Sequence, residues 1–323
     1  MSAADVRVPL AAPPMTRRRR WQAAWRRPET RWAYLFLLPW ILGFLVFTAG
    51  PMLASLVLSF TDYDVINPAT YVGGENYQRM VEDPEVRTAL FNTVLYTVIH
   101  VPLSIAIALA LAVLLNQIGG RFAGFFRTVF YLPAMTPTVA VGVLFLLLLN
   151  GQNGLVNALL RLFGINGPAW TTDPDWVRWG IIIMSLWTIG GTIVILFAAL
   201  KNVPNDLYEA ARIDGAGAWR QFREVTVPMI SGSLFFVTIV NTIASLQMFT
   251  EVYTMFYGNA QSELQASDSA LFYVIYLFQQ GFQFLEMGYA SALAWGLFAI
   301  VLIVTLVQVK LGDRFVYYEG DDR

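Results

Sequence analysis

The sequence has no cysteine, one histidine and few charged residues, and each shortage excludes a kind of function. Without cysteine, the 323 residues can form no disulfide, thiolate metal site or cysteine nucleophile. The single histidine, His100, is too little for a histidine-rich metal site, and no metal site is predicted. Charged residues make up 13% of the chain, against about 25% in a typical soluble domain. The net charge of −1 indicates no nucleic-acid partner.

The chain also lacks the phosphate-binding loop GxxxxGK[ST], so it has no familiar means of hydrolysing ATP itself. The long apolar stretches contain no cluster of His, Asp or Glu, which argues against a membrane-embedded enzyme. Arg127 and Glu251 are placed near span ends, where a charged group reaches the interface at low cost. This pattern disfavours a proton-coupled carrier and an anionic substrate, and favours a neutral, hydroxyl-rich ligand.

What the chain has in excess is apolar sequence, at 57% of its residues. This content falls in blocks close to the roughly 20 residues that a helix needs to cross a bilayer. An all-α polytopic membrane protein of about six transmembrane helices is therefore predicted. The expected spans are about 34–60, 89–115, 128–149, 179–200, 230–256 and 289–310. A short amphipathic helix is expected at 269–282, and the structural role expected for His100, close to Pro102, is a hydrogen-bonded imidazole at a helix kink.

Lysine and arginine placement predicts the orientation. A basic tail, 1–33, precedes the permeation domain expected at 34–310, and a short tail, 311–323, follows it. With the N-terminus in the cytoplasm, all but four of the 21 Lys and Arg residues fall in inside segments; the exceptions are Arg79, Arg87, Arg161 and Arg178. The positive-inside rule thus predicts both termini and the loop 201–229 in the cytoplasm.

The most informative stretch is in that last large cytoplasmic loop, residues 204–228, which read PNDLYEAARIDGAGAWRQFREVTVP. Pro204 suits the first turn of a helix, and Gly215 offers the left-handed backbone that ends one. A second helical run, 218–225, is expected to stop before Pro228. Two short helices at an angle are predicted, with apolar side chains that have no partner in their own loop. A hairpin resting on the bilayer and a docking element for another protein both fit this chemistry.

These residues resemble the EAA loop of importer permeases of the ABC class, whose pattern is EAA, then a glycine, then an isoleucine-x-leucine-proline ending. Here EAA is 209–211, the glycine is Gly215, and the ending is Val225, Val227 and Pro228, with valine in place of isoleucine and leucine. DLYEAARIDGA is similar to the form found in the carbohydrate branch, the maltose-importer type. The resemblance extends to LPWILGFLVFTAGPMLASLVLSFTDYD in the first span, FYLPAMTPTVAVGVLF in the third and GQNGLVNALL after it. The N-terminal tail lies outside it.

The resemblance implies the type I importer permease fold, with the EAA loop as a coupling helix that fits a cleft on a cytoplasmic ATPase. The residues implied at that contact are Glu209, Ala210, Ala211, Asp214, Gly215 and Ala216. The chain would sit in the inner membrane and hold no cofactor, with ATP and Mg on the ATPase. The implied partners are a related second permease subunit, two ATPase copies, an extracytoplasmic solute-binding protein and a small neutral sugar or oligosaccharide.

The maltose-type permease places substrate contacts on the helix after its EAA loop. Counting forward from the EAA glutamate, those contacts fall on Asn241, Ala244, Ser245 and Met248. Met248 stands where that permease has an amide, which puts the identity of the sugar in question. The substrate-path candidates are Asn241, Ser245 and Met248 on the fifth span, and Trp187 and Thr188, beside Gly191, on the fourth. Helix packing and interhelical hydrogen bonding remain an alternative for each of them.

A secondary carrier or channel for a small neutral solute is the alternative function. It predicts ion-coupled transport without an ATPase, inverted internal repeats and ionisable groups inside the membrane. No clear repeat is found in the sequence. A gene neighbourhood that encodes an ATPase and a binding protein would favour the importer.

Overall fold

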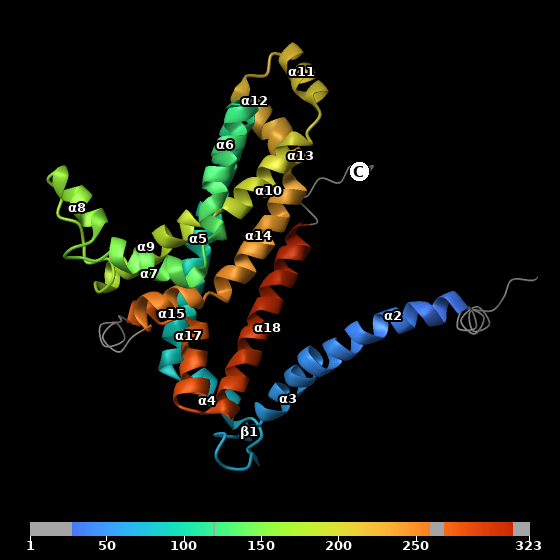
Figure 1. Cartoon of the computed structure of the whole chain (residues 1–323), viewed down its shortest axis with the longest axis vertical. Helices are drawn as coiled ribbons and strands as arrows, with labels where there is room; N and C mark the ends of the chain where they lie inside the picture. The colour runs from blue at the N-terminus through green and yellow to red at the C-terminus, as the bar shows by residue number, and fades with distance from the viewer. Residues whose placement is uncertain (1–27, 119, 259–267, 313–323) are drawn as a thin grey trace, which may run out of the picture. The chain divides into compact units, whose positions relative to one another are not determined.

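The computed structural model describes residues 28–118, 120–258 and 268–312 (Figure 1). The chain divides into two compact units, Met1–Val57 and Leu58–Arg323. The described part of the first unit is one helical run made of α2 (Pro28–Phe44), the π-helical turn η1 (Leu45–Ala49) and α3 (Gly50–Leu58), whose last residue belongs to the second unit. This run covers the first predicted span, 34–60, except for its last two residues. Helix α2 begins inside the predicted tail 1–33, of which 1–27 lie outside the described residues.

The second unit begins with two short antiparallel strands and two helices. These elements are β1 (Thr61–Asp62), β2 (Thr70–Tyr71), α4 (Glu75–Glu82) and α5 (Pro84–Ile118), and Thr61 pairs with Tyr71. The next elements are α6 (Gly120–Tyr131), the 3₁₀ turn η2 (Leu132–Met135), α7 (Thr138–Leu148), α8 (Leu155–Leu162), α9 (Pro174–Trp187) and α10 (Gly190–Lys201). At 35 residues, α5 is about 52 Å long and exceeds the bilayer core, because an α-helix rises 1.5 Å per residue.

The rest of the second unit contains the predicted coupling loop and the last spans. Its elements are α11 (Asn205–Ile213), α12 (Ala218–Gln221), η3 (Phe222–Thr226), α13 (Val227–Met229), α14 (Ser231–Leu246), α15 (Thr250–Phe256), η4 (Asp268–Ala270), α17 (Tyr273–Phe278), η5 (Gln279–Gln283) and α18 (Met287–Gly312). The short helix expected at 269–282 is present as the continuous helical run of α17 and η5, and the 3₁₀ turn η4 comes just before it. Helix α18 enters the predicted tail 311–323, whose residues 313–323 lie outside the described part.

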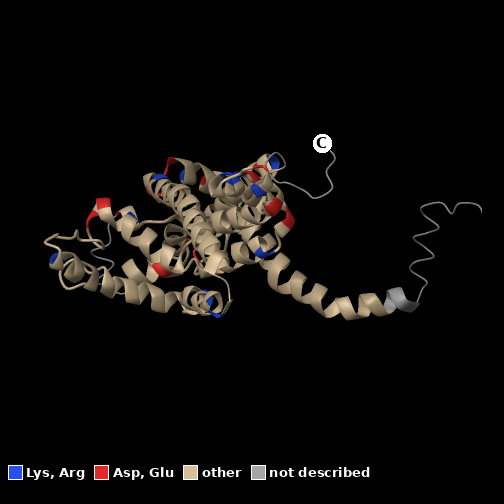
Figure 2. Cartoon of the chain, turned by 90° about the horizontal axis from the view of Figure 1, so that it is seen from above, with Lys and Arg blue, Asp and Glu red and all other residues tan. Residues whose placement is uncertain are grey.

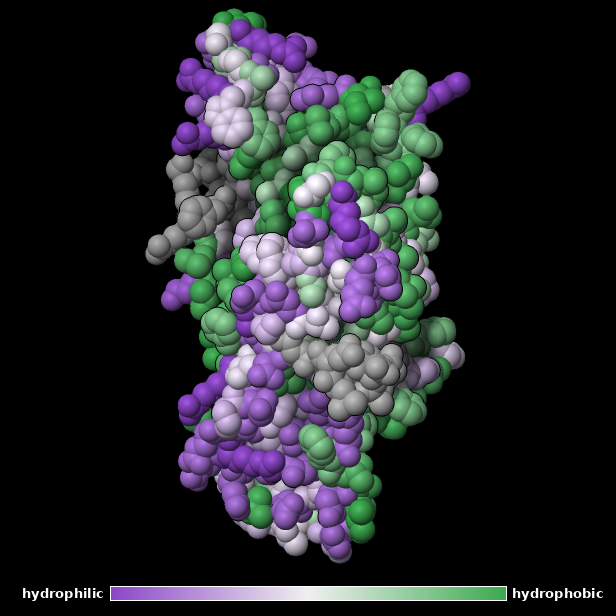
Figure 3. All heavy atoms as spheres, turned by 90° about the vertical axis from the view of Figure 1, so that its left-hand side faces the viewer, coloured by the Kyte–Doolittle hydropathy of each residue, from purple (hydrophilic) through white to green (hydrophobic). Residues whose placement is uncertain are grey.

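Length and composition mark four of the described helical runs as candidate spans: Trp32–Leu58, Pro84–Ile118, Ser231–Phe256 and Met287–Gly312. Two bent pairs raise the total to six if each is one span: Gly120–Met135 with Thr138–Leu148, and Pro174–Trp187 with Gly190–Lys201. Charged side chains are sparse along these helices (Figure 2). On the face in Figure 3, hydrophilic residues gather at two ends and in a smaller central patch, with hydrophobic residues frequent between them. An all-helical membrane protein is thus confirmed.

The third and fourth spans, predicted as single helices at 128–149 and 179–200, are both broken. The third bends by 95° next to Pro137, because a proline keeps the preceding residue, Thr136, out of the helical region; its ψ is 133°. The segment before it, expected as a short basic turn, is the helix α6. The fourth bends by 49° at Thr188, where the hydroxyl donates to the carbonyl of Ser185 and a glycine pair follows.

The second helix of the 204–228 loop does not stop before Pro228, as the sequence predicted. It continues through η3 and α13 to Met229. The π-helical turn η3 widens the backbone just ahead of Pro228 and so accommodates a residue that has no amide proton. Pro204 lies one residue before α11 in extended backbone, and not in the first turn. The chain therefore forms an almost unbroken helical path from Ala218 to Leu246.

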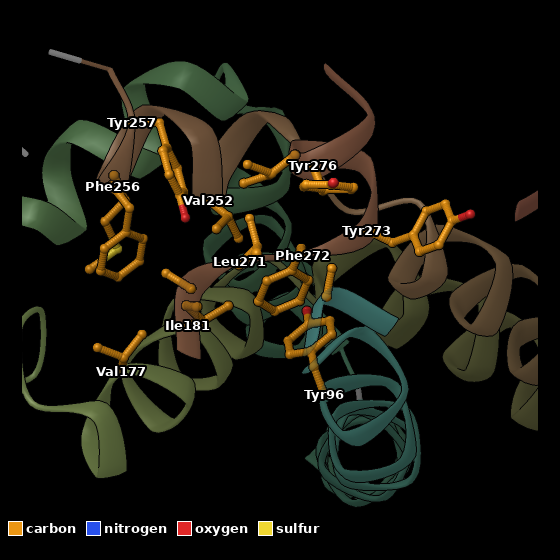
Figure 4. Close-up of a cluster of buried hydrophobic side chains, with 14 of the residues drawn as sticks. Tyr96, Val177, Ile181, Val252, Phe256, Tyr257, Leu271, Phe272, Tyr273 and Tyr276 are labelled. Atoms are coloured by element: carbon orange, nitrogen blue, oxygen red, sulfur yellow. The ribbon is translucent and has the colours of Figure 1, made fainter. Parts of the chain in front are cut away.

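Two clusters of buried side chains hold the second unit together. One joins α5 to α9, α15, α17 and α18 (Figure 4), and Tyr96, Ile181 and Phe272 belong to it. The other joins α5 to α10 and α14. On α5, Ala108 and Ala112 lie one turn apart with no exposed surface. Such small residues let neighbouring helices approach closely, as is usual where helices pack inside a membrane.

Candidate functional site

A cavity of about 500 Å³ lies where α5, α9, α10, α14 and α15 meet. That volume falls within the roughly 300–1,000 Å³ typical of small-molecule sites. Apolar side chains line it together with eight hydroxyl groups, two amides, one imidazole and one carboxylate. The polar lining residues are Tyr96, His100, Ser104, Thr138, Ser185, Thr188, Thr192, Asn241, Ser245, Gln247, Thr250 and Glu251.

Most of the residues predicted on the substrate path come together in this cavity. Asn241, Ser245 and Met248 line it from α14 and the residues just after it, and Thr188 lines it from the α9–α10 bend. Ala244 and Gly191 line it as well. Trp187 does not line the cavity. Because it precedes Thr188 by one residue, its side chain points about 100° away around α9, and its ring packs against Phe145 at 5.7 Å.

Two of these residues also tie α14 to neighbouring helices. Asn241 Nδ2 donates to Thr192 Oγ1 on α10 at 3.3 Å, and Ser245 Oγ lies 3.1 Å from Nδ1 of His100 on α5. The interhelical hydrogen bonds kept as an alternative role are therefore present. They also orient these polar groups at the cavity wall, so binding and packing can coexist at the same residues.

Sequence reasoning assigned His100 a structural hydrogen bond, which is confirmed, but did not place it in this cavity. Its ring stacks on Tyr96 at 4.9 Å, and Nε2 has no hydrogen-bond partner among the described residues. The helix itself runs unbroken through Pro102. The Tyr96 hydroxyl donates to Ser185 Oγ at 2.8 Å, which fixes the ring beneath His100.

Glu251 lies near the end of the candidate span Ser231–Phe256, where the sequence placed it, but sequence reasoning did not assign it to the cavity. The chain leaves the helix after Leu246, and a new helix, α15, starts at Thr250. Glu251 lies in the first turn of α15 and lines the cavity. The sequence is hydrophobic throughout α14 and α15, so its pattern did not predict that the helix breaks between them. Gln247, in the break itself, was missed for the same reason.

The predicted coupling residues form an exposed surface at the end of the unit that holds α11 and α12 (Figure 1). Helix α11 ends at Ile213, and Gly215 follows with a φ of +77°, as the sequence predicted. Glu209, Ala210, Asp214 and Gly215 are exposed, and Ala211 and Ala216 are half-buried. Two large apolar side chains beside them face outward: Ile213 is 86% exposed and Trp219 is 74% exposed.

Side-chain hydrogen bonds hold this loop in shape. The hydroxyls of Tyr208 on α11 and Thr226 on η3 are 3.0 Å apart. Gln221 Nε2 donates to the carbonyl of Ala216 at 2.7 Å. The loop is thus fixed by its own hydrogen bonds, while Ile213 and Trp219 stay uncovered.

At the opposite end of this unit, a polar groove of about 1,400 Å³ lies between the 62–83 segment and the start of α18. Arg79 pairs with Glu286 at 2.5 Å and lies over the ring of Tyr289 at 4.0 Å. Asp83 accepts hydrogen bonds from the hydroxyls of Tyr276 at 2.5 Å and Tyr289 at 2.8 Å. Partial burial alone would raise the pKa of Asp83, but these hydrogen bonds outweigh it and hold that pKa below its ordinary value of 3.8. The network links α4 to α17 and α18.

An Asp83→Asn variant is expected to be less stable at pH 7 by about 2 °C in unfolding midpoint, because the loss of two charge-assisted hydrogen bonds at a partly exposed site costs roughly 1 kcal/mol. Because the pKa of Asp83 is lowered in the folded protein, its ionised carboxylate stabilises the fold at pH values above the ordinary pKa of 3.8. This stabilisation is lost as the pH falls through the lowered pKa. The gap between variant and wild type should therefore stay constant down to about pH 4 and narrow only as the pH falls further, below the ordinary value of 3.8. Thermal unfolding of the purified protein from pH 7 down to about pH 2.5 measures this, with the exposed Glu82→Gln as control. A gap that stays constant over this whole range would contradict the assignment.

Among the described residues, no group of His, Asp and Glu is arranged to hold a metal ion. The cavity itself offers hydrogen-bonding groups and apolar side chains, which suit reversible binding of a small molecule.

Comparison with known proteins identifies the family. Residues 101–317 match the family described as "Binding-protein-dependent transport system inner membrane component". The Probable ABC transporter permease protein YesP of Bacillus subtilis is 36% identical over 299 residues, which cover 92% of this chain and 95% of that protein. The Lactose transport system permease protein LacF of Rhizobium radiobacter is 35% identical, over 85% of this chain and 92% of LacF. The Arabinooligosaccharides transport system permease protein AraP of Bacillus subtilis is 32% identical, over 87% of this chain and 88% of AraP.

The fold agrees with that family. A chain in the crystal structure of a bacterial ABC transporter involved in the import of the acidic polysaccharide alginate superposes with a TM-score of 0.79 and 22% identity, over 93% of this chain and all of that one. The same fold is found in the alginate transporter complexed with its alginate pentasaccharide-bound periplasmic protein, with a TM-score of 0.79 over 92% of this chain. The ATPase of such an importer is a subunit separate from this permease. This chain belongs to the family of binding-protein-dependent transport system inner membrane components, and it is a multi-pass permease subunit of an ABC importer.

Proposed function

We propose that this permease passes a neutral sugar or oligosaccharide through the cavity where α5, α9, α10, α14 and α15 meet. The transport mechanism is alternating access, which a partner ATPase drives. Asn241, Ser245 and Thr188 offer amide and hydroxyl groups to sugar hydroxyls, and Met248 offers an apolar contact. Arabinooligosaccharides and lactose, in the names of AraP and LacF, support a carbohydrate as the substrate.

The observation that carries the proposal is the helical path from the exposed loop to the cavity. Helix α12, η3, α13 and α14 follow one another from Ala218 to Leu246, with short junctions only. The start of this path is fixed to α11 by the Tyr208–Thr226 contact, and its end presents Asn241 and Ser245 to the cavity. A displacement of α11 by the ATPase can therefore move the cavity wall, because the segments from α12 to α14 move together as a rigid body.

In this proposal the exposed residues of α11 and its C-terminal turn dock on the ATPase. The contact residues are Glu209, Ala210, Ala211, Asp214, Gly215 and Ala216. Small side chains there permit close approach, and the uncovered Ile213 and Trp219 supply apolar area beside them. ATP and Mg are bound by the ATPase, which is present in two copies. A related second permease and an extracytoplasmic binding protein complete the importer.

The proposed topology follows from the same loop. Docking on a cytoplasmic ATPase requires 204–228, and with it both termini, on the cytoplasmic side. The groove around Arg79 and Asp83 then faces the exterior, where a binding protein delivers the sugar. The permease domain is 34–310 in this scheme, between the tails 1–33 and 311–323.

The test is uptake by the complete importer in proteoliposomes. The chain, its second permease, the ATPase and the binding protein are reconstituted, and uptake of labelled maltotriose, lactose and arabinotriose is measured. Import of at least one neutral sugar is expected only when ATP is inside and the binding protein is outside. Uptake driven by a proton or sodium gradient without ATP would instead support the secondary carrier.

A further inference from the structure

The cavity contains a carboxylate that neither the coupling loop nor the predicted substrate path explains. Glu251 lies within the candidate span Ser231–Phe256 and lines the cavity. Its side chain makes no hydrogen bond or ion pair with any of the described residues. A carboxylate that lines a cavity and has no partner among the described residues keeps its hydrogen-bonding capacity for water, a counter-ion or a ligand. Glu251 is therefore available to whatever enters the cavity.

The backbone around Glu251 is held firmly, so the carboxylate has a defined place. At Gly142 of α7, a Cβ atom would lie 2.9 Å from the carbonyl oxygen of Glu251, which shows how closely α7 packs against this turn. Val252, the next residue, is fully buried. Phe249, just before α15, stacks on Tyr253 at 5.1 Å and packs against Phe278 at 5.2 Å. Such support is what a binding group requires to keep its geometry.

Gln247 accompanies Glu251 on the same wall. It lies in the break between α14 and α15, four residues before Glu251, is exposed, and lines the cavity. Its backbone amide donates to the carbonyl of Ile243 at 3.2 Å, which caps α14. Its side chain makes no hydrogen bond with any residue in the described part of the chain. Carboxamide and carboxylate are thus two unpaired polar groups on one stretch of the cavity wall.

The chemistry of the two groups indicates the ligand. A carboxylate only accepts hydrogen bonds, whereas a carboxamide both donates and accepts. Adjacent hydroxyls of a sugar match this pair, because each hydroxyl can donate to the carboxylate and accept from the amide. A ligand carboxylate or sulfonate would meet a like charge, which is unfavourable in a site of low dielectric.

We propose that Gln247 and Glu251 form a hydroxyl-binding pair that determines specificity, in which Glu251 accepts hydrogen bonds from adjacent hydroxyls of a neutral sugar and repels acidic sugars. This inference rests on the proposed sugar transport through the same cavity. It adds a second polar wall, on the α14–α15 break, to the face of α14 that carries Asn241 and Ser245. The structure thereby assigns neutral sugars, and not uronates, to this permease.

The first test separates binding in the cavity from coupling. In the complete importer, Glu251→Gln keeps the shape of the side chain and removes its charge. Uptake of the best neutral sugar from the panel is expected to fall about tenfold, while ATP hydrolysis stimulated by the loaded binding protein stays within about twofold of wild type. Asp175→Asn, which removes an exposed carboxylate in the first turn of α9 that lines neither the cavity nor the groove around Arg79, is the control and should leave both rates unchanged. Parallel loss of uptake and ATP hydrolysis would overturn the assignment.

The second test identifies which sugar hydroxyls bind. Because wild type and variant use the same binding protein, its own sugar preference affects both equally and drops out of the comparison. Monodeoxy analogues and the uronic acid of the same sugar are compared with the parent in wild type and in Glu251→Gln. At least one deoxy analogue should enter wild type about tenfold more slowly than the parent, with little difference in the variant. The preference for the parent over its uronic acid should shrink by a similar factor. Equal ratios in both proteins would overturn the pair while leaving sugar import intact, whereas a wild type without ATP-dependent uptake would overturn the proposed function as well.

Discussion

A Gly215→Trp variant is expected to lose ATP-driven uptake to the background level while it stays in the membrane in close to wild-type amount. Gly215 has a φ of +77°, so any side chain there costs about 1–2 kcal/mol of local strain. No heavy atom lies within 4 Å of a Cβ at this position, so the indole has room and the fold does not clash with it. The large ring instead protrudes from the surface where the ATPase is proposed to dock. Uptake and binding-protein-stimulated ATP hydrolysis in proteoliposomes measure the effect.

Two controls separate docking from strain. Gly164 has a φ of +76° and equally open surroundings, but lies in the loop after α8, so Gly164→Trp should keep most of the uptake. Asparagine tolerates the left-handed region and is small, so Gly215→Asn should also remain active. Normal uptake by Gly215→Trp would show that this surface is not the site of ATPase coupling.

The sequence could predict the helix and the left-handed glycine of the 204–228 loop because these signals are local. A glycine at 215 ends a helix whatever surrounds it, since its backbone reaches the left-handed region without steric cost. The number of spans was similarly accessible, because hydrophobic length alone decides what can cross a bilayer. Pro228 shows the limit of local reasoning. It ends a regular α-helix, but here a π-helical turn precedes it, and the helix continues.

The cavity could not be predicted in full, because it depends on where helices bend and on what packs there. Hydrophobicity is continuous from α14 to α15, yet the helix breaks at Gln247, and this break turns Glu251 toward the cavity. The direction of the Trp187 side chain was also not predictable: position in the chain placed it beside Thr188, but its ring packs against Phe145. His100 lies far from α14 in sequence, and only the packing of α5 brings it to Ser245.

One other glycine is expected to be as sensitive as Gly215, but through folding and not through coupling. Gly190 begins α10 at the bend of the fourth span, and a Cβ there would lie 2.2 Å from the carbonyl oxygen of Phe130 and 2.9 Å from the Cα of Tyr131. Both are backbone atoms of α6, so no rotamer change can relieve the contact. Since α6 and α10 must separate, Gly190→Val should cost about 3 kcal/mol or more and leave little folded protein.

The yield of monodisperse protein in detergent and its thermal unfolding midpoint measure this loss. Gly124→Ala is the matched control, because Gly124 lies on α6 with no heavy atom within 4 Å of its Cβ position. Alanine favours helix over glycine by about 1 kcal/mol, so this control should be neutral or stabilising while Gly190→Ala is destabilising. Replacing glycine with alanine is thus expected to lower the stability at Gly190 but not at Gly124, because another backbone lies only against Gly190. A Gly190→Val protein with wild-type yield and midpoint would show that α6 and α10 do not pack closely at the fourth-span bend.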